Sequence, residues 1–241
     1  MLFNLDARAQ VSKLDLNEDG VVDKADVEAM IDEIRNAMEP HGYVDLGLSS
    51  GTLWATTNIG AESPEDYGDY FAWGETEGYN SGKTDFFMKT YKYGYETYTT
   101  TFITKYLIEN DLGYGGDIDN KTELELADDA AYVNWGDAWC IPSWQQQDEL
   151  VYECTWTYTT KNGVNGNMVV GPNGNSIFLP AAGYFNGDRL AQPGIYGCYF
   201  SRSLSTFDPG NAYVLDFLST DIGVAVNVRD AGCSIRPVRR K

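Results

Sequence analysis

From residue 43 onward, the chain consists of short apolar runs separated by Gly, Asn, Asp and Pro. This pattern is typical of short antiparallel strands joined by turns, with few helices. One helix is clear, because Ser143 follows Pro142 and has Gln146 three positions later, which forms a capping-box pattern. We expect it to continue to about Glu153. Its buried side chains should be Trp144, Leu150, Val151 and Cys154. The sequence therefore predicts an α+β domain.

The strongest turn signal is GPNGN, which separates apolar runs at residues 168–170 and 176–179 and predicts a hairpin. Further strands are expected over residues 194–201, 212–217, 222–228 and 234–238. The Tyr- and Thr-rich segment 78–116 has no clear periodicity and is interpreted as a long surface insertion. We expect its tyrosines to pack against the sheet, with a binding surface as the alternative.

The segment DLNEDGVVDKAD, residues 15–26, has the spacing of a calcium-binding loop. Calcium takes about six to eight oxygen ligands, and alternate acidic residues converge on it when the chain curls around the ion. Gly20 would supply the sharp turn. Asp26 stands where Glu is usual, and this departure resembles the dockerin version of the loop. The expected ligands are Asp15, Asn17, Asp19, Val21, Asp23 and Asp26. An acidic turn before an ordinary helix is the alternative.

An apolar stripe follows the loop at helical spacing, formed by Val27, Met30, Ile31, Ile34 and Met38. Pro40 and Gly42 end this helix. We therefore divide the chain into a helical EF-hand- or dockerin-like module at residues 1–40 and a larger domain at residues 41–241. Dockerins carry two such loops and this chain shows one. The stripe is expected to pack on the neighbouring domain or on a second copy, and the Ca²⁺ to be structural.

The formal charge of −19 over 241 residues disfavours nucleic acid as a partner, because binding it requires a basic stripe. No apolar run approaches the roughly 20 residues of a membrane-spanning helix, and no signal segment begins this chain. The single His41 argues against a histidine triad or a multi-histidine metal site. Four cysteines in no CxxC pattern leave the disulfide state open. They are Cys140, Cys154, Cys198 and Cys233.

Four long motifs carry a family resemblance. They are YVDLGLSSGTLWATTNIGAESPEDYGDYFAWGET at residues 43–76, DDAAYVNWG at 128–136, NGVNGNMVVGPNGNSIFLPAAGY at 162–184 and SIRPVRR at 234–240. Together they resemble a group of gut Bacteroidales proteins with a C-type-lectin-like fold, related to the Fibrobacter succinogenes major paralogous domain. The resemblance implies a C-type-lectin-like domain. That family often has Cys where this chain has Thr57, and Trp where it has Phe200.

Residues 195–235 contain no Lys, Glu, Gln, Met or Trp, although the rest of the chain contains 39 of them and about eight would be expected from composition alone. Those five amino acids cannot be reached when both adenines of an Asn codon ending in a pyrimidine are replaced at random. The segment YFSRSLSTFDPGNAYVLDF also resembles the variable region of a diversity-generating retroelement target, which in this family reads like YWSSSLNT…NPNNAYNLNF. Strands and turns that simply avoid these residues are the alternative.

Alternation within residues 212–218 favours a variable region over strands and turns that simply avoid these residues. Tyr213, Leu215 and Phe217 should face the core, and the neighbouring positions should face outward. The resemblance assigns ligand contact to this outward set: Tyr196, Cys198, Arg202, Ser205, Phe207, Asp208, Gly210, Val214, Asp216, Leu218, Thr220, Asp221, Gly223, Ala225, Asp230, Ala231 and Cys233. For Cys198 and Cys233, buried free thiols and a disulfide are alternatives to a contact role.

These observations predict a receptor- or adhesin-type protein without enzymatic activity. It would bind a protein or glycan ligand through a hypervariable surface, outside the cell, at the cell surface or on a phage. A conventional carbohydrate-binding lectin is one alternative, although the chain has QPG at residues 192–194 rather than EPN or QPD, and lacks WND. An enzyme of the formylglycine-generating type is another. It would need a reactive thiolate beside a basic group, and no acid–base constellation is visible in the sequence.

Overall fold

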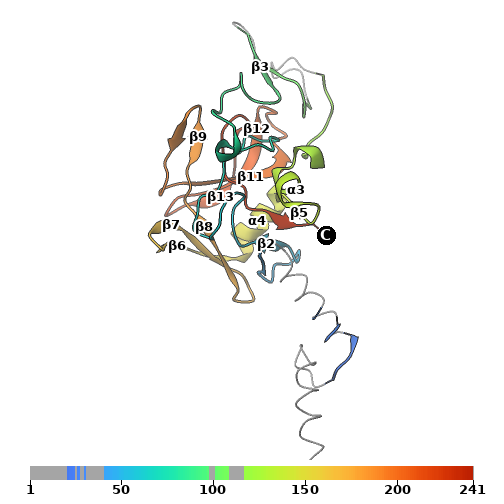
Figure 1. Ribbon diagram of the computed structural model, residues 1–241, viewed down its shortest axis with the longest axis vertical. Helices are drawn as coiled ribbons and strands as arrows, with labels where there is room; N and C mark the ends of the chain where they lie inside the picture. The colour runs from blue at the N-terminus through green and yellow to red at the C-terminus, as the bar shows by residue number, and fades with distance from the viewer. Residues whose placement is uncertain are drawn as a thin grey trace, which may run out of the picture. The chain divides into compact units, whose positions relative to one another are not determined.

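The computed structural model describes residues 21–24, 26, 27, 30, 41–97, 101–108 and 117–240. The chain divides into two compact units, residues 1–42 and 43–241. Figure 1 shows the larger unit as mostly strands with few helices. Strands account for 36% and helices for 13% of the structure, consistent with an α+β fold.

Within its described residues, the larger unit contains five antiparallel sheets. A four-stranded sheet contains, in spatial order, β1 (Tyr43–Asp45), β2 (Leu53–Ala55), β14 (Val238–Arg239) and β5 (Trp139–Cys140). Because β14 pairs with β2, the two ends of the domain lie next to each other in this sheet. Two small hairpins are β3 (Gly94–Glu96) with β4 (Thr101–Ile103), and β9 (Tyr184–Asn186) with β10 (Arg189–Ala191). Short helical elements are η1 (Tyr79–Ser81), η2 (Leu126–Asp128) and α3 (Ala130–Trp135).

The hairpin expected across GPNGN is confirmed. It joins β7 (Val164–Val170) to β8 (Ser176–Pro180), and β6 (Thr155–Lys161) completes their sheet. Helix α4 (Trp144–Glu153) is also confirmed with its capping box, since the Ser143 side chain accepts from the Gln146 N–H and Gln146 bonds back to Ser143. Leu150 and the unexpected Gln147 are its buried residues, while Trp144 and Val151 are half-buried.

The third sheet consists of β11 (Gly197–Leu204), β12 (Asn211–Phe217) and β13 (Ile222–Val228). Strands are confirmed near three of the four expected positions. The fourth, residues 234–238, is a strand only at its end, because Ser234 instead makes an isolated parallel bridge to Tyr199.

Two hydrophobic clusters lie on either side of this sheet. Phe200 and Val214 belong to the first cluster, and Tyr199, Leu215 and Phe217 belong to the second, which also contains Leu150 of α4. Since successive strand residues point to opposite faces, β12 contributes to both clusters. A central strand covered on both sides holds the backbone of this region in place.

The described part of the 78–116 segment is not merely superficial. Tyr91, Tyr93 and Tyr106 are buried, as expected for tyrosines that pack rather than form a surface. Arg229, which is fully buried, holds the segment by donating to the carbonyls of Lys105, Tyr106 and Pro209 at 3.0–3.3 Å. Its guanidinium also lies 4.7 Å from the Trp73 ring.

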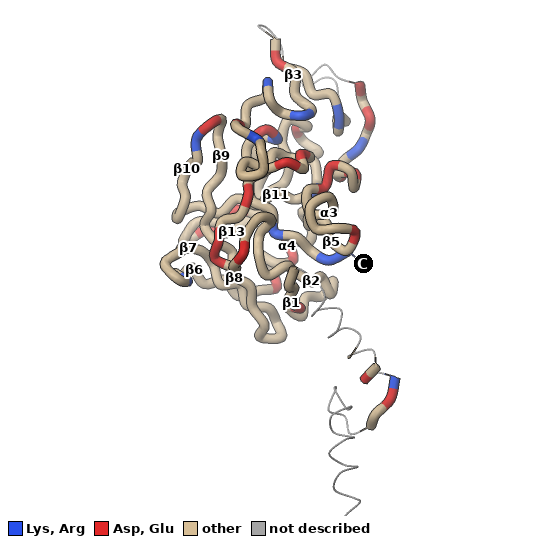
Figure 2. The backbone as a smooth tube through the Cα atoms, in the orientation of Figure 1, with Lys and Arg blue, Asp and Glu red and all other residues tan. Residues whose placement is uncertain are grey.

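A charged cluster completes that attachment, and basic and acidic stretches lie close together in this part of the backbone (Figure 2). The buried Asp128 carboxylate accepts from Lys92 Nζ at 2.8 Å, and from Lys105 Nζ and the Tyr106 hydroxyl at 2.5 Å each. Burial opposes the charge of Asp128, but these hydrogen bonds from Lys105, Lys92 and Tyr106 outweigh it and lower its pKa.

Candidate functional site

The register of the third sheet brings alternate positions of the expected outward set onto one face. Cys198 lies opposite Asp216, which lies opposite Gly223 on the next strand. Val214 lies opposite Ala225. Directly paired residues of antiparallel strands have side chains on the same face. Residues far apart in the sequence therefore meet on one surface.

We use "contact face" for the half-buried members of this set, Tyr196, Asp216, Gly223 and Ala225. The Tyr196 hydroxyl donates to Asp216 Oδ2 at 2.7 Å. A methyl group built on Gly223 would meet nothing within 4 Å. The face therefore combines one polar pair with two small residues. It has room for a larger side chain at Gly223, whereas Tyr196 and Ala225 pack against the first hydrophobic cluster.

Several residues of the outward set are not exposed. Val214 was expected to point to solvent, and this expectation is wrong, because the residue is 1% exposed within the first hydrophobic cluster. The reason is that β12 is covered on both faces, which alternation alone cannot reveal. The other buried members are Cys198, Ser205, Gly210, Ala231 and Cys233. Conversely, Tyr213 was expected in the core and is half-buried against Trp144, with ring centroids 5.5 Å apart.

The remaining members divide between the two ends of the sheet. Leu218, Thr220 and Asp221 lie at the β12–β13 turn, beside the contact face. Phe207, which is 84% exposed, and Asp208 lie in the β11–β12 loop at the other end, and Asp230 follows β13 at that same end. A strand of seven residues, such as β12, is about 20 Å long. The expected contacts therefore form two groups rather than one.

Arg202 is separate from both groups. It lies within the irregular part of β11, where the register shifts between Phe200 and Leu204. Its Nε donates to Glu123 Oε2 at 2.7 Å, and both side chains are partly exposed. Arg202 is thus held by a local ion pair.

The polar pair of the contact face has unusual electrostatics. Burial raises the pKa of the Asp216 carboxyl above its ordinary value, and the hydrogen bond from Tyr196 offsets part of that rise. Burial also raises the pKa of Tyr196. Asp216 is therefore a carboxylate whose charge is poorly solvated. A ligand that donates a hydrogen bond to it would offset the free-energy cost of burying that charge.

Three of the four cysteines have thiols that are poorly suited to act as nucleophiles. Burial raises the pKa of Cys140 and Cys154 to about 11, and raises the pKa of Cys233 well above its ordinary value. Arg202 Nη1 lies 3.7 Å from Cys140 Sγ, but its effect on the pKa is smaller than that of burial. Reactive thiols need a lowered pKa, so the raised pKa values of these three thiols argue against a nucleophilic role.

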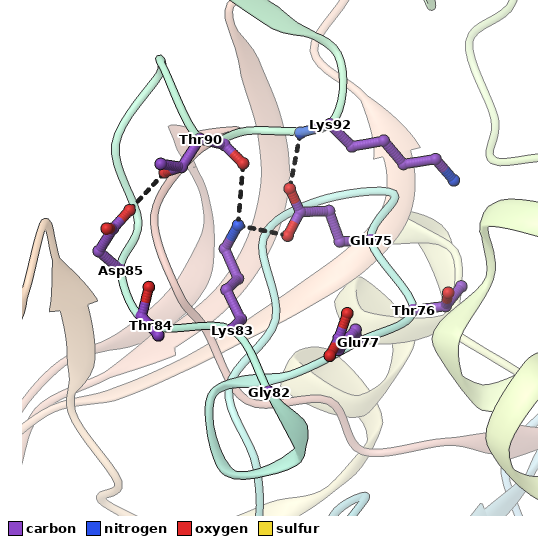
Figure 3. A pocket seen from close by; sticks show the side chains of 9 residues that line it. All are labelled: Glu75, Thr76, Glu77, Gly82, Lys83, Thr84, Asp85, Thr90 and Lys92. Carbon is purple, nitrogen blue, oxygen red and sulfur yellow. Dashed lines mark hydrogen bonds and ion pairs between the residues drawn. The ribbon is translucent and has the colours of Figure 1, made fainter.

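A cavity of about 420 Å³ was not anticipated from the sequence (Figure 3). The Lys83 ammonium lies 2.6 Å from Glu75 Oε2, and both side chains are 9% exposed. The Lys92 N–H donates to the other Glu75 oxygen at 2.7 Å. Burial is the largest cause of the raised pKa of Asp230, and Lys83 and Glu75 of this cavity have smaller effects on it, of opposite sign. The lining residues are Glu75, Thr76, Glu77, Gly82, Lys83, Thr84, Asp85, Thr90 and Lys92. They lie in or just before a segment without periodicity, so no pattern signalled them.

The expected calcium loop is described only in part, since Asp15, Asn17 and Asp19 lie outside the described residues. Val21 and Asp23 are exposed, and Asp26 is 2% exposed. The Asp26 carboxylate accepts from the Asp23 N–H at 2.8 Å. Of the expected apolar stripe, Val27 and Met30 are described, and both are exposed. Among described residues generally, no group of three or more His, Cys, Asp or Glu side chains is placed to hold a metal ion.

Within the described ranges, the helices are all too short or too polar to cross a membrane. Comparison of the chain with protein-family models, with curated proteins and with solved structures finds no match. The geometry of the chain itself must therefore support any functional proposal.

Proposed function

We propose that this protein binds a protein or glycan ligand through a hypervariable surface on a C-type-lectin-like domain, without catalysing a reaction. The contact face and the adjoining β12–β13 turn would form the main part of that surface. The exposed β11–β12 loop with Phe207 would form a second part. Like the family that its motifs resemble, the protein would act outside the cell, at the cell surface or on a phage.

One observation carries this proposal, namely the register that places Asp216, Gly223 and Ala225 side by side. Each occupies a position that the sequence pattern marked as variable, and each is half-buried. Strand residues that alternate with them, Leu215 and Phe217, are buried in the second cluster. A backbone held from the opposite face allows side chains on this face to change without repacking the core.

The surface also has the chemistry of a recognition site. Leu218 at one end of the sheet and Phe207 at the other are exposed apolar residues. Asp216 and Asp221 are near Leu218 in the sequence, and Asp208 follows Phe207. Apolar groups surrounded by polar ones are typical of protein-binding surfaces. The partly desolvated Asp216 would favour a ligand that donates a hydrogen bond or carries a positive charge.

The DNA that flanks the gene tests the proposal. Adenine-directed diversification requires a near-identical template repeat next to a reverse transcriptase gene. In that repeat, we expect Asn codons at the positions of Asp216, Gly223 and Ala225, and the same codons as in the gene at Leu215 and Phe217. An intact locus without such a repeat would contradict hypervariability.

We further propose that the N-terminal loop binds structural Ca²⁺ through Asp15, Asn17, Asp19, Val21, Asp23 and Asp26. Calorimetric titration of the full chain should give one site, which Asp15→Ala removes and Asp216→Asn retains. Asp15→Ala also distinguishes this calcium ion from one bound at a lectin-type site. If glycan binding is lost with a chelator yet survives Asp15→Ala, then the conventional lectin alternative is favoured.

A further inference from the structure

Two cysteines meet beside the contact face, since Cys198 lies opposite Asp216 in the strand register. Cys198 on β11 and Cys233, which follows β13, have their Sγ atoms 3.0 Å apart. Both side chains are 0% exposed. The backbone brings them together independently of the sulfurs, because the Ser234 N–H donates to the Cys198 carbonyl at 3.1 Å and the Phe200 N–H donates to the Ser234 carbonyl at 3.1 Å.

The surroundings of the pair are apolar apart from one side chain. Cys198 and Cys233 belong to the first hydrophobic cluster, together with Phe200, Val214 and Ala231. Asn227 Nδ2 lies 3.5 Å from each of the two sulfurs. Asn227 lies on β13 opposite Ala212.

We propose that Cys198 and Cys233 form an intramolecular disulfide that closes the chain around β12 and β13. The oxidant would be a small-molecule disulfide such as oxidised glutathione. One cysteine thiolate attacks that disulfide, forms a mixed disulfide and releases one glutathione thiolate. The second cysteine thiolate then attacks the cysteine sulfur of the mixed disulfide and releases the other glutathione. Overall, two protein thiols are oxidised to one disulfide, and one glutathione disulfide is reduced to two thiols.

The bond would form during folding rather than afterwards. In the folded protein both sulfurs are inaccessible, and burial raises the pKa of Cys233, which leaves little thiolate to react. Before the core closes, both thiols are exposed to the oxidant. Once formed, the bond would be shielded from reductants for the same reason.

The placement gives the disulfide a specific consequence. The two cysteines are 35 positions apart, and the chain between them contains β12, β13 and most of the exposed positions expected to vary. Cross-linking the ends of a segment restricts its unfolded conformations whatever side chains it carries. The bond would therefore stabilise the scaffold equally across different surface sequences, and its existence does not depend on the proposed function.

A variant that retains only this pair gives the direct test. Cys140→Ala/Cys154→Ala protein is denatured, reduced, refolded with a mixture of reduced and oxidised glutathione, quenched in acid, and alkylated in denaturant. We expect monomers with no alkylated cysteine and a mass about 2 Da below that of the reduced chain. Two alkylated thiols, a glutathione adduct or a disulfide-linked dimer as the main product would overturn the proposal.

Stability gives a second readout on the wild-type chain, which remains useful if the variant does not fold. The oxidised protein should melt about 5–15 °C above the protein refolded with a reductant. Cys198→Ala/Cys233→Ala should lose this difference, whereas Cys154→Ala should keep it. Peptide mapping of the oxidised wild type must show the 198–233 cross-link. Equal melting temperatures with free thiols in the map would contradict the proposal, even if the flanking DNA supports hypervariability.

Discussion

The two faces of the β11–β12–β13 sheet are made by the same strands, and a hydrophobic cluster covers each of them, but the residues next to the β12–β13 turn are packed much more closely on one face than on the other. On one face, Leu215 and Phe217 are 1% exposed, and Phe217 lies 6.0 Å from the rings of both Tyr199 and Trp156. On the contact face, Asp216, Gly223 and Ala225 are half-buried and mostly small. One set of backbone hydrogen bonds thus supports a packed side and a side with room for change.

This difference indicates at which positions of the sheet side chains can be substituted. A side chain that packs against many neighbours cannot change volume without cost, and a side chain beside open space can. The boundary between these regimes does not follow strand alternation here, because Val214 belongs to the contact face by register and to the core by burial. Substitutions on the two sides of this boundary should therefore differ in their effect on stability.

The largest effect is expected from truncating the packed face. Phe217→Ala should lower the free energy of unfolding by about 3–5 kcal/mol, because a buried aromatic ring leaves a cavity. Leu218→Ala, next along the chain and exposed, should change it by less than about 1 kcal/mol. Urea unfolding of both variants measures the contrast, and equal losses would remove the distinction between the faces.

The next effect locates the inner edge of the contact face. Val214→Asn should cost about 3 kcal/mol or more, because it buries an amide in an apolar cluster. Ala225→Asn, directly opposite in the register, should cost about 1 kcal/mol or less. The same urea titration compares them. If Val214→Asn were tolerated as well as Ala225→Asn, burial at this position would be unimportant and the face would extend to it.

A pair of glycines gives an intermediate effect. A methyl group at Gly197 would lie 2.2 Å from the Phe217 ring, whereas one at Gly223 would meet nothing within 4 Å. Gly197→Ala should therefore cost about 1–3 kcal/mol through overpacking, and Gly223→Ala should stay within about 0.5 kcal/mol. Thermal melting of the two variants decides the point, and a reversed order would contradict the packing described for β11.

The smallest effect concerns pH. Because the pKa of Asp216 is raised in the folded state, the folded protein binds more protons than the unfolded chain from about pH 4 upward. The contribution of Asp216 to the free energy of unfolding therefore falls as the pH rises through its folded-state pKa. Asp216→Asn retains an acceptor for Tyr196, so its stability relative to wild type should increase from pH 3.5 to pH 7.

Asp128 provides the control of opposite sign for this pH series. Its pKa is lowered in the folded state, so its contribution is present above about pH 4 and is lost as the pH falls below that value. Asp128→Asn should therefore be most destabilising at pH 7 and less so at pH 3.5. Urea unfolding at both pH values measures both variants, and the same sign for the two would show that Asp216 is not buried as described.

Local signals in the sequence predicted local structure well. Ser143 and Gln146 predicted the start of α4, and GPNGN predicted the β7–β8 hairpin, since caps and turns depend on neighbouring residues. Covering elements could not be predicted in this way. The burial of Val214, the anchoring of Tyr106 by Arg229, and the Glu75–Lys83 pair each depend on segments distant in sequence. For the same reason, the sequence could suggest which residues contact a ligand but not how deeply each of them is buried.

Repeated sequencing of this gene from one microbial population would show whether the contact face varies while the packed face stays constant. Substitutions should be frequent at Tyr196, Asp216, Leu218, Gly223 and Ala225, and rare at Tyr199, Leu215 and Phe217. They should also be rare at Cys198 and Cys233. Equal substitution frequencies on the two faces of the sheet would contradict a fixed scaffold that carries a variable binding surface.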